Sequence, residues 1–153
     1  MSLINHRRRS ARWHGASQKV GQSAAPLFLD RIDIQCEITP VPFKDISKAA
    51  PGEPSANIRE RVIKAREIQA ARYKDYKGIH CNAQMTERMI HQFAEPNEAG
   101  IDMLRMAMEK LSLSARAYSR ILKVARTIAD LEGCEHVELH HLAEAIGYRA
   151  LDR

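Results

Sequence analysis

The feature that most constrains the fold of this 153-residue chain is the helical spacing of its apolar residues, which continues from residue 55 almost to the end. Before that point, residues 29–38 alternate apolar and polar side chains as a half-buried strand does. One strand cannot form a sheet by itself, whereas several amphipathic helices bury one another's apolar faces. The pattern therefore predicts an all-α bundle of four to five helices with a short strand and an irregular N-terminal segment.

Start and stop signals set the expected bounds of the helices. Ser55 and Ser114 are natural N-caps, and Gly133 is a natural helix end. The expected helices cover residues 55–73, 86–93, 98–111, 114–131 and 138–149. Ile58, Val62, Ala65 and Ile68 share one side of the first helix. The spacing in the later helices predicts these core residues: Ile101, Leu104, Met108 and Leu111; Tyr118, Ile121, Leu122, Ala125, Ile128 and Ala129; Leu139, Leu142, Ala145 and Ile146.

Three parts follow along the chain. Residues 1–28 are basic and irregular and are expected to be disordered. Residues 29–54 hold the predicted strand and a proline-rich linker, and residues 55–153 form the helical domain. No apolar run has the roughly 18 residues that cross a bilayer, and no secretory signal follows the first arginines, so we expect a soluble, cytoplasmic protein.

The positive charge of the chain is concentrated at its start. The formal net charge is +5, and residues 1–19 hold Arg7, Arg8, Arg9, Arg12 and Lys19 without any Asp or Glu. The remaining residues are therefore formally neutral. A basic tail of this kind can bind polyanions such as nucleic acid through phosphate contacts, but it gives little information about the folded part.

Cysteine and histidine patterns favour no metal site. Three cysteines, an odd number without a CxxC pair, indicate reduced thiols. They are Cys36, Cys81 and Cys134. His136, His140 and His141 lie close enough in sequence to suggest a metal, but further ligands of suitable spacing are missing, so surface or helix-capping roles are favoured.

The segment from Ser114 to Leu131 carries an arginine at an unexpected place. Arg116 falls in the first helical turn, where the backbone N–H groups already carry partial positive charge and a cation is unfavourable. The same N–H groups together with a guanidinium can bind a phosphate, so Arg116 is a candidate phosphate ligand. The alternative is a solvated basic face formed by Arg116, Arg120, Lys123 and Thr127.

Other chemistry finds no support in the sequence. It contains no Gly-rich phosphate loop, no GxSxG, no HExxH and no zinc-finger spacing. Asp30 and Asp33 form too ordinary a pair to indicate acid–base catalysis. We therefore predict no enzymatic activity for the chain alone.

Four stretches of the chain stand out together: Phe28-Leu-Asp-Arg-Ile-Asp-Ile-Gln35, Val41-Pro-Phe43, Gly52-Glu-Pro-Ser-Ala-Asn-Ile-Arg-Glu-Arg-Val62 with Ala65-Arg66, and residues 113–131. In combination they resemble the C-terminal part of magnesium-chelatase-like AAA+ ATPases of the ComM/YifB family. The resemblance extends from about Leu27 to Arg149. It implies that residues 55–153 are an AAA+ helical lid and residues 29–54 the last piece of the ATPase core.

The resemblance also suggests roles for individual arginines. Arg31 matches the arginine of the LDRxD stretch, which serves in related ATPases as an arginine finger to a neighbouring subunit's nucleotide. Arg116 matches the sensor-2 arginine, which contacts the nucleotide phosphates, and Arg120 is a second nucleotide-binding candidate. Arg120 and Arg126 match family positions whose alternative use is in salt bridges or subunit interfaces.

The sequence also departs from the family. The Walker A and Walker B segments are absent, so this chain is expected to bind no cofactor alone, with ATP and Mg²⁺ bound in the full-length parent. The family's cysteine-rich approach to LDRxD is replaced by residues 20–28, which contain no cysteine and directly precede the LDRxD stretch with Arg31.

The main prediction is therefore a lid fragment whose partners are the ATPase core and neighbouring subunits of a hexamer, in a motor associated with DNA and not with membranes. Family members resemble branch-migration motors of natural transformation. Two alternatives remain open. One is a free-standing helical module that binds nucleic acid through residues 1–19 and the Arg116–Lys123 face. The other is a protein–protein adaptor that uses the helix over residues 55–73.

Overall fold

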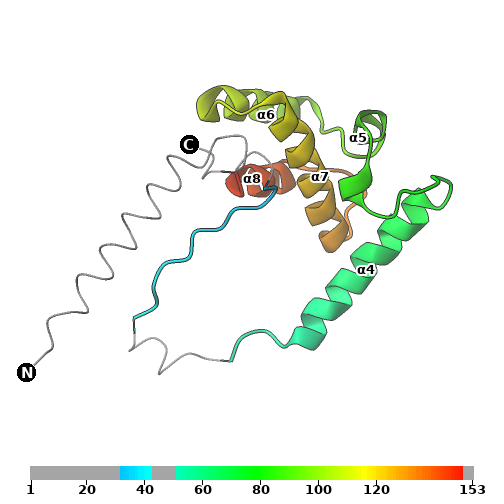
Figure 1. The fold of residues 1–153 in the computed structure, drawn as a ribbon, viewed down its shortest axis with the longest axis vertical. Coiled ribbons are helices and arrows are strands. Elements are labelled where there is room, and N and C mark those ends of the chain that lie inside the picture. Colours follow the sequence, from blue (N-terminus) through cyan, green and yellow to red (C-terminus); the bar gives the residue numbers. More distant parts are fainter. Residues whose placement is uncertain (1–31, 43–50, 150–153) are drawn as a thin grey trace, which may run out of the picture.

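The computed structural model describes residues 32–42 and 51–149, and these form an all-α bundle without β-strands (Figure 1). The all-α prediction is confirmed. Five α-helices and one 3-10 helix, η1, follow one another along the described chain. Their bounds are α4 Ser55–Tyr73, η1 Asn82–Gln84, α5 Glu87–Phe93, α6 Glu98–Leu111, α7 Ala115–Glu132 and α8 Leu139–Gly147.

Helix α7 is the centre of the bundle and contacts α4, η1, α5 and α8, while α6 packs against α8. The predicted apolar stripe makes this possible, because its members from Ile121 to Ala129 are buried and Tyr118 is half-buried. Ser114 caps the helix through its hydroxyl, which accepts a hydrogen bond from the Ala117 amide at 3.2 Å. Gly133 ends it at φ 74°, a left-handed conformation that glycine adopts without strain.

The other helix bounds follow the sequence signals closely. Thr86 and Asn97 cap α5 and α6 by accepting hydrogen bonds from the Met89 and Gly100 amides. Ser55 is the one predicted cap that is wrong, because it is the first helical residue and Pro54 occupies the N-cap position. Pro54 leads into the helix with a φ of −60°, and its ring carries no acceptor, so no side-chain cap forms.

Burial differs from the predicted core at the edges of the bundle. Leu104, Leu142 and Ala145 are buried as expected, but Ile101 and Leu139 are 42% and 38% exposed. Met108, Leu111 and Ile146 are half-buried. Leu139 is the first residue of α8 and α6 contacts only one neighbouring helix closely, so spacing alone overestimates the buried faces of these short elements.

The predicted strand is not formed in its described part. Residues 32–42 run as an extended segment, and Ile34 and Ile38 are 52% and 90% exposed. A strand requires hydrogen bonds to a neighbouring strand, and the described ranges contain no other strand that could supply them. Residues 1–31, which include the predicted basic segment, lie outside the described residues.

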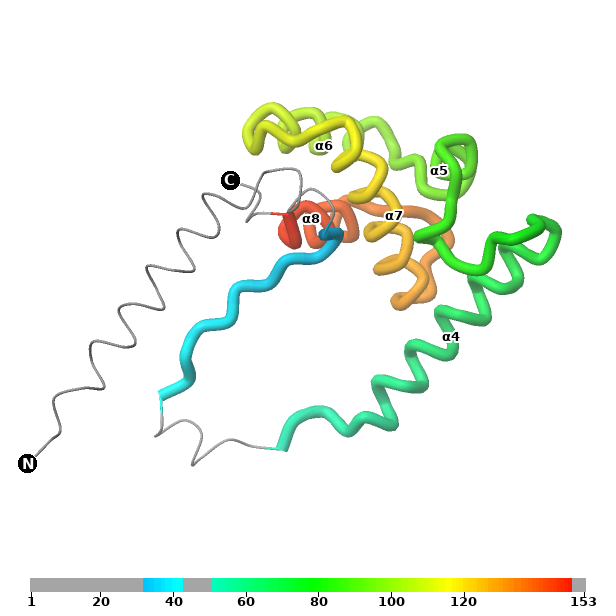
Figure 2. Tube along the Cα trace, in the orientation of Figure 1, coloured from blue at the N-terminus to red at the C-terminus, as the bar shows by residue number. Residues whose placement is uncertain are grey.

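Helix α4 is attached to the bundle through its C-terminal half, and its N-terminal half projects outward (Figure 2). Its buried side chains are Ala65, Gln69 and Tyr73, all in its second half, whereas residues 55–64 are exposed throughout. The exposed character predicted for this charged helix is confirmed. In the described part of the chain, no helix is long and apolar enough to span a bilayer.

Candidate functional site

The start of α7 places Arg116 on the surface. Ala115 is the first helical residue and Arg116 the second, next to the Ser114 cap. The cap satisfies the Ala117 amide, while the first amides of a helix point outward without partners in the helix itself. Among the described residues, Arg116 is exposed and takes part in no ion pair. The positive end of α7 and an uncompensated guanidinium thus lie together, as a bound anion requires.

Arg120, one turn further along α7, has a partner in the extended segment. Its guanidinium donates to the Asp33 carboxylate at 2.5 Å, and the two side chains are 30% and 52% exposed. Lys123 donates to the Ala83 carbonyl at 3.0 Å. The basic face predicted for α7 is therefore partly engaged within the chain. The nucleotide-binding role of Arg120 stays a prediction.

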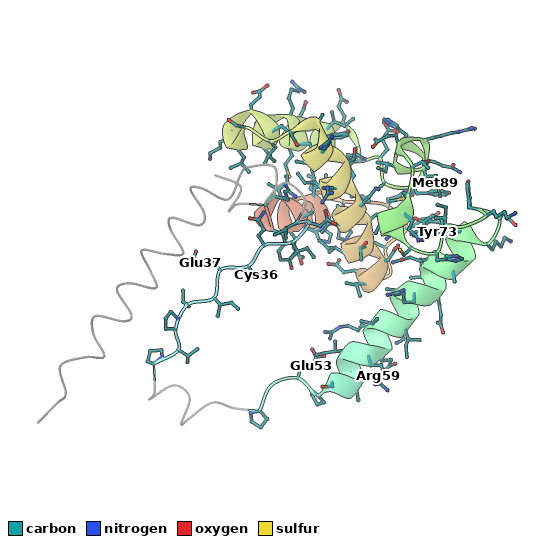
Figure 3. The ribbon with its side chains drawn as sticks, viewed as in Figure 1. Cys36, Glu37, Glu53, Arg59, Tyr73 and Met89 are labelled. Atoms are coloured by element: carbon teal, nitrogen blue, oxygen red, sulfur yellow. The ribbon has the colours of Figure 1, made fainter. Side chains whose placement is uncertain are left out.

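Two hydrogen bonds to backbone carbonyls fix the extended segment against residues 148 and 149, which follow α8. The Gln35 amide donates to the Tyr148 carbonyl at 2.9 Å, and Arg149 Nη1 donates to the Ile32 carbonyl at 2.7 Å. Figure 3 shows the segment leaving the bundle beyond Cys36 and Glu37. Arg31 lies outside the described residues, so its role as an arginine finger stays a prediction.

A pocket of about 370 Å³ lies between the extended segment and α7. Ile34, Val124, Ile128 and Leu131 give it mainly apolar walls, and Arg120 and Lys123 lie at its polar edge. Arg116 is not among the lining residues. Arg116 is thus exposed outside this pocket, and a phosphate bound there would need further groups outside the described residues.

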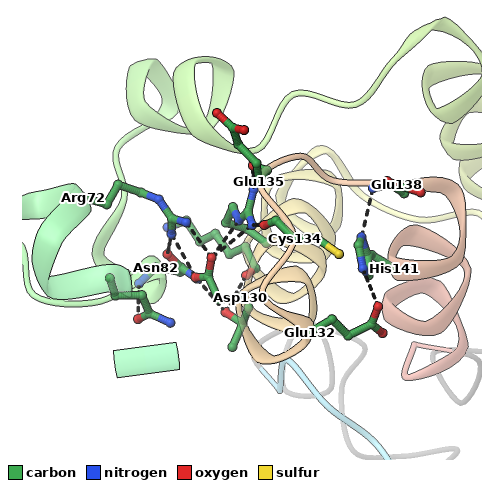
Figure 4. Close-up of polar contacts among 12 residues, drawn as sticks. Arg72, Asn82, Asp130, Glu132, Cys134, Glu135, Glu138 and His141 are labelled. Carbon is green, nitrogen blue, oxygen red and sulfur yellow. Dashed lines mark hydrogen bonds and ion pairs between the residues drawn. The ribbon is translucent and has the colours of Figure 1, made fainter. Parts of the chain in front are cut away.

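A fully buried polar site lies at the other end of α7 (Figure 4). Asp130 accepts hydrogen bonds from Arg72 at 2.5 and 2.8 Å, from Arg126 Nε at 3.1 Å and from Asn82 at 2.8 Å. Arg126 also donates to the Glu135 and Cys134 carbonyls at 2.7 and 2.5 Å. The side chains of Arg126 and Asp130 are 1% and 0% exposed. The salt bridge predicted for Arg126 is present.

The network shifts the protonation equilibria of its members. Burial by itself would raise the pKa of Asp130, but the hydrogen bonds from Arg72 and Asn82 and the charge of Arg126 outweigh it and lower that pKa. Burial lowers the pKa of Arg126, and the negative charge of Asp130 offsets part of this effect. Asp130 is therefore ionised and held between two guanidinium groups.

Sequence reasoning missed Arg72, Asn82 and Asp130. Arg72 and Asp130 are separated by 58 positions, and a charged pair so far apart has no periodic signal. The one available hint was the i, i+4 spacing of Arg126 and Asp130 on the apolar side of α7.

A second cluster joins α7 to α8. The carboxylate of Glu132 accepts from His140 Nε2 at 2.9 Å and from His141 Nε2 at 3.1 Å, and His141 Nδ1 accepts from the Glu138 amide at 2.9 Å. This pattern assigns the proton of the buried His141 to Nε2. A metal bound at Nε2 would require the proton on Nδ1, facing the Glu138 N–H, so the cluster suits a helix cap and not a metal.

Comparison with known proteins identifies the family. A family model described as magnesium chelatase, subunit ChlI C-terminal, matches residues 52–149. The chain belongs to this family. The match begins at the linker before α4 and ends at Arg149, so this ChlI C-terminal family domain comprises the whole described bundle.

Several relatives share the domain. The chain is 43% identical to competence protein ComM of Haemophilus influenzae over 127 residues and 41% identical to YifB of Escherichia coli over 127 residues. It is 32% identical over 130 residues to protein Mb2921c of Mycobacterium bovis. These alignments cover 82%, 82% and 85% of the chain but 24%, 24% and 25% of the relatives. The chain thus corresponds to the C-terminal region of a magnesium-chelatase-like protein of the ComM/YifB family and spans about a quarter of the relatives' length.

Proposed function

We propose that this domain is the helical lid of an AAA+ ATPase and that Arg116 is its sensor-2 arginine. The observation that carries the proposal is the exposed guanidinium at the positive end of α7, the central helix. Such a cation raises the free energy of the isolated helix slightly, because it repels the helix dipole. A nucleotide phosphate held by the rest of the protein supplies the missing negative charge.

The proposed chemistry is electrostatic. During phosphoryl transfer, negative charge spreads over the oxygens of the γ-phosphate, and a guanidinium directed at them stabilises the transition state. The first amides of α7 add dipolar stabilisation at the same place. ATP and Mg²⁺ are bound by the ATPase core, so the isolated chain holds no cofactor and hydrolyses nothing.

The extended segment fits the last strand of that core. Its apolar side chains are exposed and its backbone forms no strand in the described chain. Both features suit a segment that joins a sheet supplied by the longer parent protein. We assign residues 29–54 to the core remnant and residues 55–153 to the lid. The contacts of Asp33 with Arg120 and of Ile32 with Arg149 join this extended segment to the lid, and in sequence they follow directly after the arginine-finger candidate Arg31.

The assembly proposed for the parent is a cytoplasmic hexamer associated with DNA. The lid would contact its own ATPase core and a neighbouring subunit. The Haemophilus influenzae relative is named competence protein ComM, and this name supports the proposed association with DNA.

The test uses the full-length parent carrying Arg116→Ala. Loss of a charge directed at the transition state is expected to lower the ATPase turnover about 10- to 1000-fold. Arg66→Ala is the matched control, because Arg66 is an exposed arginine on α4 and its removal is expected to leave turnover unchanged. An unchanged rate for Arg116→Ala would refute the sensor role.

A free-standing nucleic-acid-binding module is the second candidate, and the charge of residues 1–19 favours it. Affinity for a DNA duplex, measured across a salt series with and without residues 1–19, separates the two parts of the chain. Binding that disappears with the tail shows that the Arg116–Lys123 face contributes nothing, and this candidate then fails. The ion pair of Arg120 with Asp33 already reduces the positive charge that this face can offer.

A further inference from the structure

The attachment of α4 to the bundle is short. Residues 55–64, which we call the arm, are exposed along their full length, and the helix is held by Ala65, Gln69 and Tyr73 with their neighbours (Figure 2). Packing angles between helices scatter by about 15–20° for otherwise similar apolar contacts. A contact of little more than two turns therefore leaves the direction of the arm weakly determined by apolar packing alone.

The contact between α4 and α7 is completed by a polar layer. Arg72 Nη1 and Nη2 donate to the two carboxylate oxygens of Asp130 at 2.8 and 2.5 Å, and Arg72 also donates to Asn82 Oδ1 at 3.1 Å. Tyr73 donates to the same Asn82 oxygen at 2.7 Å, and the Asn82 amide donates to Gln69 at 3.3 Å. A bidentate pair fixes both the position and the plane of a guanidinium, so this layer is directional.

Arg72 is one of three donors to Asp130. Arg126, from the same helix, and Asn82, from η1, also bond to the carboxylate, so Asp130 keeps two donors in a variant without Arg72. The Arg72 side chain is 13% exposed, so water can reach the vacated position. The bond that Arg72 adds is specifically the one between α4 and α7 (Figure 4).

We propose that the Arg72–Asp130 pair sets the angle between α4 and α7, so that the arm moves with α7 as one rigid body. Arg72 is a positioning residue in this assignment. Arg116 and Asp130 lie near opposite ends of α7, so a movement of α7 on nucleotide binding passes directly to the arm. That consequence rests on the proposed function, whereas the fixed angle does not.

Distances between spin labels test the angle in the chain itself without nucleotide. In a background with Cys36, Cys81 and Cys134 replaced by serine, labels at Arg59→Cys and Ala115→Cys report the direction of the arm relative to α7. Residue 59 lies about 20 Å along the helix from Arg72. A rotation of about 15–20° therefore displaces the label by about 5–7 Å.

The expected result is one narrow distance distribution with Arg72 present, and a distribution shifted or widened by about 5–7 Å in Arg72→Gln. Arg72→Lys keeps the charge but cannot form the bidentate pair of a guanidinium, so it is expected to widen the distance distribution as well. Arg66→Gln, at an exposed position of the same helix, is the matched control and leaves it narrow. A second pair of labels, Ala115→Cys and Ala143→Cys, reports α7 against α8 and stays narrow in every variant.

An unchanged distribution in Arg72→Gln would overturn the proposal. Equal widening of both label pairs would also overturn it, because Arg72 would then stabilise the bundle in general. A narrow distribution in Arg72→Lys would show that charge alone sets the angle and would refute the bidentate assignment. Failure of the nucleotide-sensing role of Arg116 would leave all of these distances unaffected, so the two proposals are separable.

Discussion

The two ends of α7 place an arginine in opposite environments. Arg126 is buried beside Asp130 and uses its donors on one carboxylate and two carbonyls, whereas Arg116 is exposed at the positive end of the helix. A buried guanidinium is tolerated only where it is paired and hydrogen-bonded. An exposed one without a counter-charge contributes nothing to the fold and is free to bind a ligand. The comparison separates a structural arginine from a functional candidate on the same helix.

Replacing Asp130 is expected to have the largest effect on stability. Asp130→Asn keeps the shape of the side chain but leaves the charges of Arg72 and Arg126 without their counter-ion in the interior. The expected loss is about 3–5 kcal/mol in the free energy of unfolding, measured by chemical denaturation.

The exposed pair of Asp102 with Arg105 provides the matched control, since both side chains are more than half exposed. Asp102→Asn is expected to cost at most about 1 kcal/mol. Equal losses for the two variants would mean that the network at the end of α7 is no more structural than a surface ion pair.

Lowering the pH should gradually remove the stability that the charge of Asp130 contributes. The folded-state pKa of Asp130 is lowered, so the stability that its charge contributes is fully present above its unfolded pKa of about 3.9 and is lost as the pH falls through the folded value. The difference in unfolding free energy between the parent chain and Asp130→Asn should therefore narrow below about pH 4. A difference that stays constant down to pH 2 would contradict the assigned ionisation.

The sequence predicted α7 well because the signals for its ends are local. Ser114 and Gly133 act through hydrogen bonds with residues three to five positions away, and the apolar stripe between them follows one helical period. Both ends and the position of Arg116 at the start of the helix could be read from the chain. The resemblance gave the family, and the family match confirms it.

Features that depend on distant segments could not be predicted in this way. The pairing of Arg72 with Asp130 and of Arg120 with Asp33 joins residues 58 and 87 positions apart, and no local preference encodes either contact. The strand expected at residues 29–38 failed in its described part for a related reason. Alternation gives a segment the capacity to join a sheet, but the hydrogen bonds come from a neighbouring strand.

The smallest expected effect belongs to Arg116 itself and has the opposite sign from that of the Asp130 variant. In the isolated chain, Arg116→Ala removes a cation from the positive end of α7 and introduces a better helix former, so the free energy of unfolding should stay the same or rise by up to about 1 kcal/mol. Thermal unfolding at low salt measures the gain, and added salt should reduce it by screening the dipole. Arg66→Ala, at an exposed position away from the helix ends, should show no salt-dependent gain. A loss of more than 1 kcal/mol on replacing Arg116 would mean that the side chain supports the bundle, and the contrast between the two ends of α7 would no longer hold.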